Sequence, residues 1–268
     1  MNPASPTFED LVLAYRNTAA HNDSLFKACT EAVWADPVLA AHRRHVDEAR
    51  LGFGDPAFHF LWQALLEAAS RRFQRPGLLE IGIYKGQVIS LWALLARERG
   101  IDLSISALGP LAGQPRPPGS LRTKLLYRLS RRFREQVDNG NFYEDEDYEA
   151  TVRAHFSKWD LDFGRVKVHR GFSNDPKLLR ELEGEVFHVV YVDGDHTHQG
   201  ALHDFVTFGP KVAPGGWLVA DDAGQDLPGS AFWKGHEAVT RAARILPSLG
   251  FRNVLNVGHN RVYERLPG

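Results

Sequence analysis

The chain has 268 residues, and its charges nearly balance, with 32 Lys and Arg against 33 Asp and Glu. This balance excludes a strong overall attraction to polyanions, and the single cysteine, Cys29, excludes an intramolecular disulfide and a cysteine-based zinc site. No apolar run approaches the ~18 residues that a bilayer crossing needs, and the N-terminus lacks a basic-then-apolar signal. We therefore expect a cytoplasmic protein built on one large α/β domain.

The N-terminal part of the chain carries helical patterns only. Apolar residues recur at helical spacing, so residues 1–76 are predicted to form a helical cap on a sheet built by residues 77–268. The predicted helices span 8–15, 25–34 and 58–73. The aromatic residues between positions 53 and 62 are expected to pack in the core. The alternative is that residues 53–59 form one wall of a binding pocket.

A strand, a glycine-containing turn and a helix follow one another from residue 78. The turn is Glu80-Ile81-Gly82-Ile83-Tyr84-Lys85-Gly86, and the helical pattern runs from Val88 to about Arg99. Gly82 and Gly86 let backbone amides approach a ligand. The turn lacks the Gly-Lys-Ser/Thr ending of a phosphate loop and the Gly-x-Gly-x-x-Gly pattern of a dinucleotide site. Glu80 at the strand end favours a cationic ligand over a diphosphate.

The next two predicted strands offer few polar groups at their ends. Residues 101–107 and 165–170 have strand patterns, and the first of them ends without a carboxylate, so that Ser106 is its polar candidate. Ser173 follows the second strand and is either a ligand contact or a helix cap.

Between these strands lies an insertion at about 109–147 that contains a predicted basic amphipathic helix, 121–137. Leucines recur there every four residues among lysines and arginines, with no acid before Glu135. One interpretation is a solvated charged face; the other is a lid or docking surface for an anionic ligand or a lipid headgroup, and thus a peripheral membrane contact. Nothing else adds to a basic footprint, so nucleic acid is not expected. The acidic run 144–147 is predicted to be a loop.

The most informative stretch is the buried strand 186–192 and the cluster after it, Asp193-Gly194-Asp195-His196-Thr197-His198. A second apolar strand ends in Asp221-Asp222, and a helical stripe at about 199–212 connects the two strands. Such a βαβ unit has parallel strands, so the carboxylates converge if the strands are neighbours. Converging carboxylates need a cation or a proton, and a hard divalent metal is the expected partner. Alternatively, Asp195 caps the helix and Asp221-Asp222 lines a solvated loop.

A helix over 237–249 and a hairpin of two strands, 251–257 and 261–266, are predicted to complete the chain. His236 precedes this helix, and His259 lies in the turn of the hairpin. Both imidazoles are expected to be structural or solvated.

Several of these motifs together resemble a known enzyme family. The segment Glu80 to Gly86 is similar to motif I of class I S-adenosylmethionine-dependent methyltransferases. Asp193-Gly194-Asp195-His196, combined with Asp221-Asp222, resembles the later motifs of the macrocin O-methyltransferase type, a branch that methylates sugar hydroxyls of natural products and is often magnesium-dependent. The resemblance covers about residues 50–265. It implies a seven-stranded, mostly parallel, doubly wound Rossmann-like sheet with the strands before Asp193 and Asp221 adjacent.

The resemblance implies an O-methyltransferase that uses S-adenosylmethionine and Mg²⁺ or another divalent cation. Its metal ligands would be Asp193, Asp221 and Asp222. His196 is the expected general base, kept neutral by the positive end of a helix, and Asp195 is the alternative base or orienting residue. The cofactor contacts would be Glu80, Gly82, Tyr84, Lys85, Gly86, Ser106, Ser173 and Asp193. The family usually places an acid at the end of the second strand to bind the ribose, and this chain has none there.

The expected acceptor is a hydroxylated small molecule such as a sugar in natural-product or glycan biosynthesis, and the resemblance alone suggests a homo-oligomer. Two other functions remain open. One is a non-catalytic cofactor-binding or assembly protein of the same fold. The other is a hydroxylase or hydrolase that uses the same acidic cleft, although the chain lacks the Gly-x-Ser-x-Gly elbow of a serine hydrolase.

Overall fold

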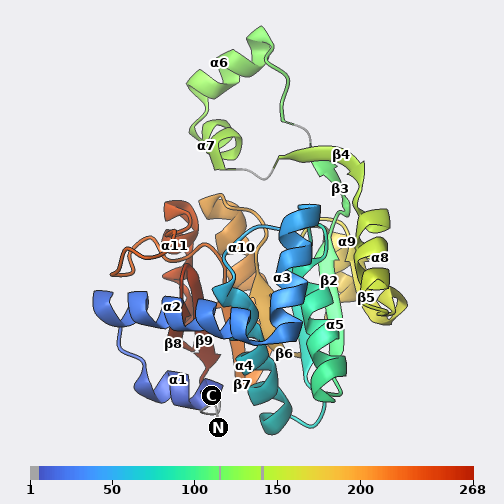
Figure 1. Cartoon of the computed structure of the whole chain (residues 1–268). Coiled ribbons are helices and arrows are strands. Elements are labelled where there is room, and N and C mark those ends of the chain that lie inside the picture. The colour runs from blue at the N-terminus through green and yellow to red at the C-terminus, as the bar shows by residue number, and fades with distance from the viewer. Residues whose placement is uncertain (1–5, 115, 140–141) are drawn as a thin grey trace.

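The structure is a computed structural model that describes residues 6–114, 116–139 and 142–268. Its centre is a seven-stranded sheet in the order β5-β2-β1-β6-β7-β9-β8 (Figure 1). The strands are β1 (Gly77–Ile81), β2 (Ser104–Gly109), β5 (Val166–Arg170), β6 (Phe187–Val192), β7 (Val212–Ala220), β8 (Phe251–Val257) and β9 (Asn260–Arg265). All pairings from β5 to β7 are parallel, whereas β9 is antiparallel to both β7 and β8. The predicted fold class is therefore confirmed.

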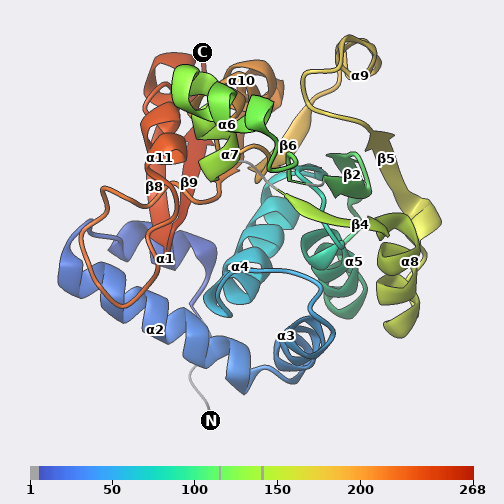
Figure 2. The same ribbon diagram turned by 90° about the horizontal axis from the view of Figure 1, so that it is seen from above.

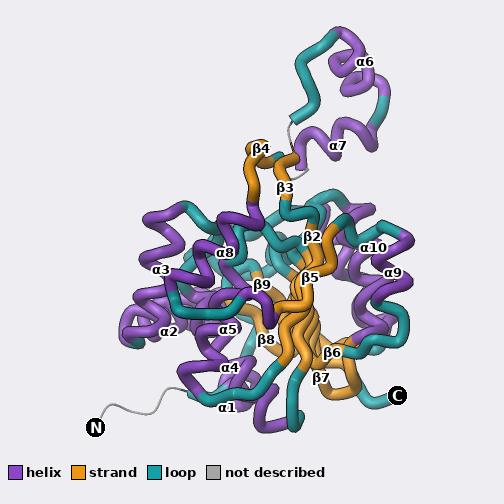
Figure 3. Tube along the Cα trace, turned by 90° about the vertical axis from the view of Figure 1, so that its right-hand side faces the viewer, coloured by secondary structure: helices purple, strands orange, loops and turns teal. Residues whose placement is uncertain are grey.

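Helices cover both faces of this sheet, as the side view in Figure 3 shows. One face carries α1 (Phe8–Ala14), α2 (Ala19–Ala35), α3 (Pro37–Ala49), α4 (Ala57–Arg72), α5 (Gln87–Arg99) and α8 (Tyr148–Lys158), and the other carries α9 (Pro176–Glu181), α10 (His198–Phe208) and α11 (Glu237–Ala243). Side chains alternate between the two layers, since Val189 and Tyr191 join the first core and Val190 and Val192 the second. Among the described residues, no helix is long and apolar enough to cross a membrane.

The N-terminal helices share their apolar core with the sheet. Phe8 packs edge-to-face on Trp217 of β7, with ring centroids 5.3 Å apart. Trp62 of α4 makes the same kind of contact with Tyr191 of β6 at 5.0 Å, and aromatic pairs of this geometry add to the stabilisation from apolar burial. The packing holds the loop between α3 and α4 beside the carboxyl end of β1, where Phe53 stacks on Tyr84.

The insertion after β2 forms a helical arm (the described residues of 112–147) that stands above the sheet in Figure 1. It contains β3 (Ala112–Gln114), α6 (Leu121–Leu129), α7 (Arg131–Asn139) and β4 (Tyr143–Asp147). The prediction of one helix over 121–137 is wrong, because the backbone leaves the helix at Ser130, whose hydroxyl accepts a hydrogen bond from Phe133 N and starts α7. The acidic run 144–147 is not a loop either, since it belongs to β4 and pairs with β3.

Gly82 closes the turn after β1 at a very close approach of two backbone segments. Its φ is +104°, and a Cβ at this position would lie 1.9 Å from the carbonyl oxygen of Asp193. The amide of Gly82 donates to Leu108 O, and the amide of Asp193 donates to Ile81 O, so both segments are fixed. Only glycine fits this turn.

We expect Gly82→Ala to lower the free energy of unfolding by about 3 kcal/mol or more, because the new methyl group collides with fixed backbone. Gly100→Ala is the matched control, since Gly100 also has a positive φ of +65° but no atom within 4 Å of its Cβ position. That control should cost only about 1 kcal/mol from backbone strain. Urea denaturation of both variants measures the difference, and equal losses would contradict the close approach.

Candidate functional site

Two neighbouring parallel strands bring carboxylates to one edge of the sheet. The amide of Asp193 donates to Ile81 O at the end of β1, and the amide of Asp221 donates to Val192 O at the end of β6. Asp193 and Asp221 therefore follow adjacent strands at the same level, and Asp222 comes next in the chain. This confirms the convergence of strand ends that the βαβ pattern predicts.

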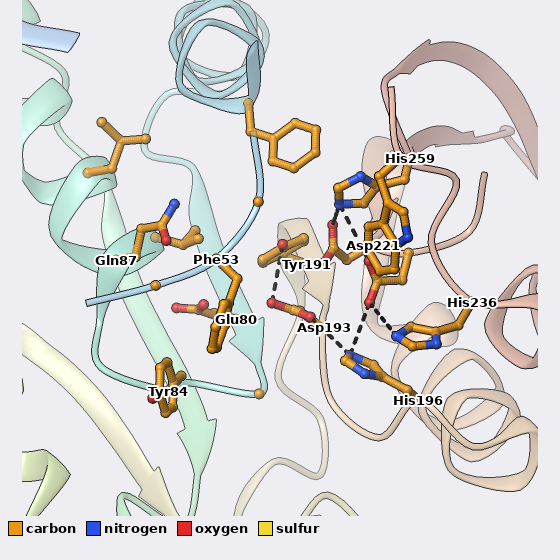
Figure 4. A pocket seen from close by; sticks show the side chains of 18 of the residues that line it. Phe53, Glu80, Tyr84, Gln87, Tyr191, Asp193, His196, Asp221, His236 and His259 are labelled. Carbon is orange, nitrogen blue, oxygen red and sulfur yellow. Dashed lines mark hydrogen bonds and ion pairs between the residues drawn. The ribbon is translucent and has the colours of Figure 1, made fainter. Parts of the chain in front are cut away.

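Three imidazoles surround these carboxylates (Figure 4). The Nε2 atom of His196 lies 3.2 Å from Asp222 Oδ2 and 3.7 Å from Asp193 Oδ1. The Nε2 atom of His236 lies 3.7 Å from the same Asp222 oxygen. On the other side, His259 Nε2 lies 3.4 Å from Asp221 Oδ1 and 3.4 Å from Asp222 Oδ1. We call these six side chains the carboxylate–imidazole cluster.

His236 and His259 belong to this cluster, which the sequence-based expectation of structural or solvated imidazoles missed. The hairpin of β8 and β9 places His259 in its turn, and the antiparallel pair Ala220↔Arg261 brings that turn beside the end of β7. His236 is held by its own amide, which donates to Asp222 O. The hairpin that carries His259 could be predicted from the sequence. The register of β9 on β7, which decides where the turn of the hairpin lies, could not.

Asp222 has an unusual backbone for a residue with a side chain. Its φ is +53°, in the left-handed region, which Asp and Asn enter more readily than most residues. The backbone of Gly235 lies so close that its Cβ position is 2.3 Å from Asp222 O. This conformation points the carboxylate of Asp222 at three imidazoles at once, and strained backbone of this kind gathers at functional sites.

The electrostatics of the cluster reflect burial and crowding. Burial, with the charge of Asp221 adding to it, raises the pKa of both Glu80 and Asp222 to about 8. Burial, followed by the charges of Asp221 and Asp222, raises the pKa of Asp193 well above its usual range. These three carboxyl groups therefore hold protons to unusually high pH, because too little positive charge is nearby.

Asp221 and His259 form the charged pair within the cluster. Burial opposes the charged form of each group, but the mutual attraction of the two is stronger. The pKa of Asp221 is accordingly lowered and that of His259 is raised. Burial first, and then the neighbouring His236, lowers the pKa of His196 to about 4, so His196 is neutral at pH 7.

The cluster forms one wall of a cavity of about 560 Å³. An aromatic part of the lining comes from the α3–α4 loop and α4, and its Phe58 packs edge-to-face on His259 of the cluster, with ring centroids 4.5 Å apart. This aromatic part includes Phe53, Phe58, His59 and Trp62, and Glu80 and Tyr191 also line the cavity. The expectation of core packing is confirmed for Phe58, Phe60 and Trp62, which are buried, and is wrong for Phe53, which is 69% exposed at this cavity. The alternative of a pocket wall at residues 53–59 also holds, since Phe53, Gly54, Phe58 and His59 line the cavity.

A second cavity of about 350 Å³ adjoins the first across the turn after β1, because Gly82 and Tyr84 line both. It lies at the carboxyl ends of β2 and β5, and its other lining residues include Leu108, Gly109, Gln114, Gln136, Ser173 and Asp195. Two adjoining cavities at the carboxyl ends of parallel strands match the place where open α/β sheets bind ligands.

Three of the predicted cofactor contacts line neither cavity. Ser106 is buried in the middle of β2, because this strand continues to Gly109 and ends two residues later than the pattern suggested. Lys85 turns away toward Tyr148, with its Nζ 5.4 Å from the ring centroid, and pairs with Glu146 at 3.5 Å. Gly86 begins α5, where a Cβ would lie 2.9 Å from Val152 Cγ1.

The comparisons with known proteins agree with this geometry. A family model described as a methyltransferase domain matches residues 79–223, which is more than half of the chain. The chain belongs to the methyltransferase-domain family. This match confirms the resemblance to class I S-adenosylmethionine-dependent methyltransferases. A search among curated protein sequences gave no match.

Solved methyltransferase structures share the fold at low sequence identity. The O-methyltransferase NovP is 17% identical with a TM-score of 0.57, covering 92% of this chain and 99% of NovP. The calicheamicin methyltransferase CalS11 is 14% identical with a TM-score of 0.54, covering 97% and 98%. An O-methyltransferase from Bacillus cereus, solved with S-adenosylhomocysteine (SAH), is 15% identical with a TM-score of 0.53, covering 91% and 100%.

The methyltransferase places the two predicted base candidates in different cavities. His196 belongs to the carboxylate–imidazole cluster and lines the larger cavity. Asp195 is exposed at the smaller cavity, where its carboxylate accepts a hydrogen bond from the amide of Thr197. The helix α10 starts at His198, and its cap is the hydroxyl of Thr197 rather than Asp195. The amide of His198 donates to Glu135 Oε1 of the arm at 2.9 Å.

The buried carboxyl of Glu80 makes stability fall as pH rises. The folded protein holds this proton up to a pKa of about 8, while the unfolded chain releases it near 4.5. Unfolding therefore becomes easier between these values as pH rises. In metal-free buffer we expect the free energy of unfolding of the wild type to fall between about pH 6.5 and 8. Over the same range the Glu80→Gln variant should lose about 1 kcal/mol less.

Urea unfolding at several pH values, with a chelator present, measures this effect. Glu31→Gln is the matched control, since Glu31 is 68% exposed on α2. A Glu80→Gln variant with the same loss as the wild type would show that Glu80 does not hold a proton in the folded state.

Proposed function

We propose that this methyltransferase transfers a methyl group from S-adenosylmethionine to a hydroxyl of a small-molecule acceptor with the help of a divalent cation. The acceptor would be a sugar or another polyhydroxylated precursor of a natural product or glycan. The observation that carries the proposal is the carboxylate–imidazole cluster at the larger cavity, next to a second cavity across Gly82 and Tyr84. The O-methyltransferase neighbours NovP and CalS11 support this proposal.

The smaller cavity suits the nucleoside part of the cofactor. It lies beside the glycine turn after β1, and its floor includes Leu108 and Gly109 at the end of β2. That strand end carries no acid for the ribose, so the amide side chains of Gln114 and Gln136 are the polar groups that would take its place. Glu80 lines the larger cavity next to the shared turn, and the positive charge of the cofactor beside it would favour the ionised form of its carboxyl.

The cluster fits a divalent cation. Asp221 Oδ1 and His196 Nε2 are buried and make no hydrogen bond to any described residue, although buried polar atoms are normally paired. Two subsets of the cluster could each hold a cation, because every member offers one ligand atom within 4.8 Å of the other two. One subset is Asp221, Asp222 and His259, and the other is His196, Asp222 and His236. Asp193 remains a candidate ligand beside them. A cation bound there would lower the pKa of an acceptor hydroxyl and fix its direction.

We assign His196 as general base, which places the cation in the subset Asp221, Asp222 and His259, where His196 is not a ligand. Its burial keeps the imidazole neutral at pH 7, which leaves a nitrogen able to accept a proton. The predicted cause of this neutrality was the positive end of a helix, but the helix α10 starts only at His198, and burial is the cause instead. The aromatic residues of the cavity lining, including Phe53 and Trp62, would hold the apolar face of an acceptor ring and exclude water. Asp195 lines the other cavity and remains the alternative.

Binding of S-adenosylhomocysteine tests the cofactor assignment. We expect micromolar binding in isothermal titration, loss of binding in Ser173→Trp because the indole fills the smaller cavity, and retained binding in Asp221→Asn. Ser157→Trp, at an exposed position on α8, is the matched control and should bind normally. No binding by the folded wild type at near-millimolar concentration would favour the non-catalytic alternative.

Metal binding is tested separately, with Mn²⁺ as the probe and paramagnetic resonance as the readout. Asp222→Asn should weaken Mn²⁺ binding by about 10²-fold, because the variant keeps a side chain that tolerates a positive φ but removes a charged ligand. Asp226→Asn is the matched control, since Asp226 pairs with Arg261 outside the cluster. Equal Mn²⁺ affinity in wild type and Asp222→Asn would remove the cation from the proposal.

A further inference from the structure

The arm carries an apolar stripe that no part of the described chain covers. Leu121, Leu125 and Leu129 of α6 are 87%, 58% and 76% exposed. Residues four apart on a helix advance by only about 40°, so the three side chains form one stripe along α6. Figure 1 shows α6 at the end of the arm farthest from the sheet, and in Figure 2, seen from above, α6 is drawn in front of the body near α10 and α11.

The packing of the arm itself does not use this stripe. The hydroxyl of Tyr127 donates to Asp138 Oδ1 at 2.8 Å. The guanidinium of Arg134 donates to the carbonyls of Tyr127 at 3.1 Å and Arg128 at 3.0 Å, at the end of α6. Tyr127 lies two residues from both Leu125 and Leu129, on the other side of the helix. The side-chain hydrogen bond between α6 and α7 therefore lies on the side of α6 away from Leu125 and Leu129.

Cations flank the leucine stripe, and no anion interrupts them. Arg122, Lys124 and Arg128 are exposed on α6. The chain has no Asp or Glu between Asp102 and Glu135. A short helix with leucines on one face and cations beside them has the composition of a segment that lies in a membrane interface, with leucines among the acyl chains and cations at anionic headgroups.

We propose that α6 is a docking surface for an anionic lipid bilayer. A second copy of the chain fits less well, because a symmetric contact through this patch would bring Arg122, Lys124 and Arg128 of two chains together. The stripe of a nine-residue helix is also much smaller than a stable dimer interface. A phosphodiester backbone would satisfy the cations but would leave the leucines exposed to water.

Docking through α6 would bring the larger cavity close to the bilayer. Asp138 of α7 and Phe142, which follows it in the arm, both line this cavity. The bond from His198 N to Glu135 Oε1 ties α7 to the body of the protein at the same place. The arm therefore carries both the proposed docking surface, on α6, and part of the lining of the larger cavity.

Vesicle flotation tests the proposal. The full-length protein should float with vesicles of phosphatidylcholine and phosphatidylglycerol and remain unbound with pure phosphatidylcholine, and salt of about 1 M should release it. The double variant Arg122→Gln/Arg128→Gln should lower the partition coefficient about 30-fold. The triple variant Leu121→Ser/Leu125→Ser/Leu129→Ser should lower it more than about 10-fold.

Two surface variants outside the arm are the matched controls. Leu13→Ser replaces a 79% exposed leucine on α1, and Lys27→Gln neutralises a 76% exposed lysine on α2, and both should float like the wild type. Circular dichroism of every variant shows that the chain is folded. Equal binding to both kinds of vesicle, or undiminished binding by the arm variants, would overturn the proposal. So would a lipid-independent dimer that the triple leucine variant abolishes, because a second copy would then cover the stripe.

Discussion

The arrangement of the site depends on the mutual repulsion of carboxylates that the fold forces together. Val192 at the end of β6 pairs with Ala220 at the end of β7, so Asp193 and Asp221 meet at the same level, with Glu80 one strand away and Asp222 next in sequence. The protein offsets only part of this repulsion with the His259 imidazole, and the remaining carboxyls keep their protons to high pH. A divalent cation is the partner that such a deficit of positive charge favours.

Much of the sheet and four of the six cluster residues could be predicted from sequence, because those features depend on local patterns. The apolar run of β6, the helical stripe of α10 and the apolar residues of β7 define a βαβ unit, and its handedness and parallel strands follow from general rules. Asp193, Asp221 and Asp222 follow directly after these strands and His196 follows soon after Asp193, so their meeting required only one further fact, that the two strands are neighbours in the sheet.

The other two residues of the cluster depend on contacts between distant segments. His259 reaches Asp222 through the register of β9 on β7, and a shift of that register would move it away. His236 is placed by a backbone hydrogen bond to Asp222 from a loop without regular structure. The strand β4 escaped prediction for a related reason, since its acidic sequence has no apolar alternation and its partner β3 is only three residues long.

The hydrogen bond from His198 to Glu135 joins the arm to the segment that carries His196. The first amides of a helix have no partner within it, and here the carboxylate of α7 satisfies one of them at the start of α10. The energy of this bond belongs to both elements. An event that displaces α7 and breaks this bond would therefore also change the stability of the segment that carries His196. A ligand whose affinity for the cavity depends on the position of α7 would shift the equilibrium of the arm by the same coupling free energy. The arm and the cavity are thus thermodynamically linked, in part through one carboxylate.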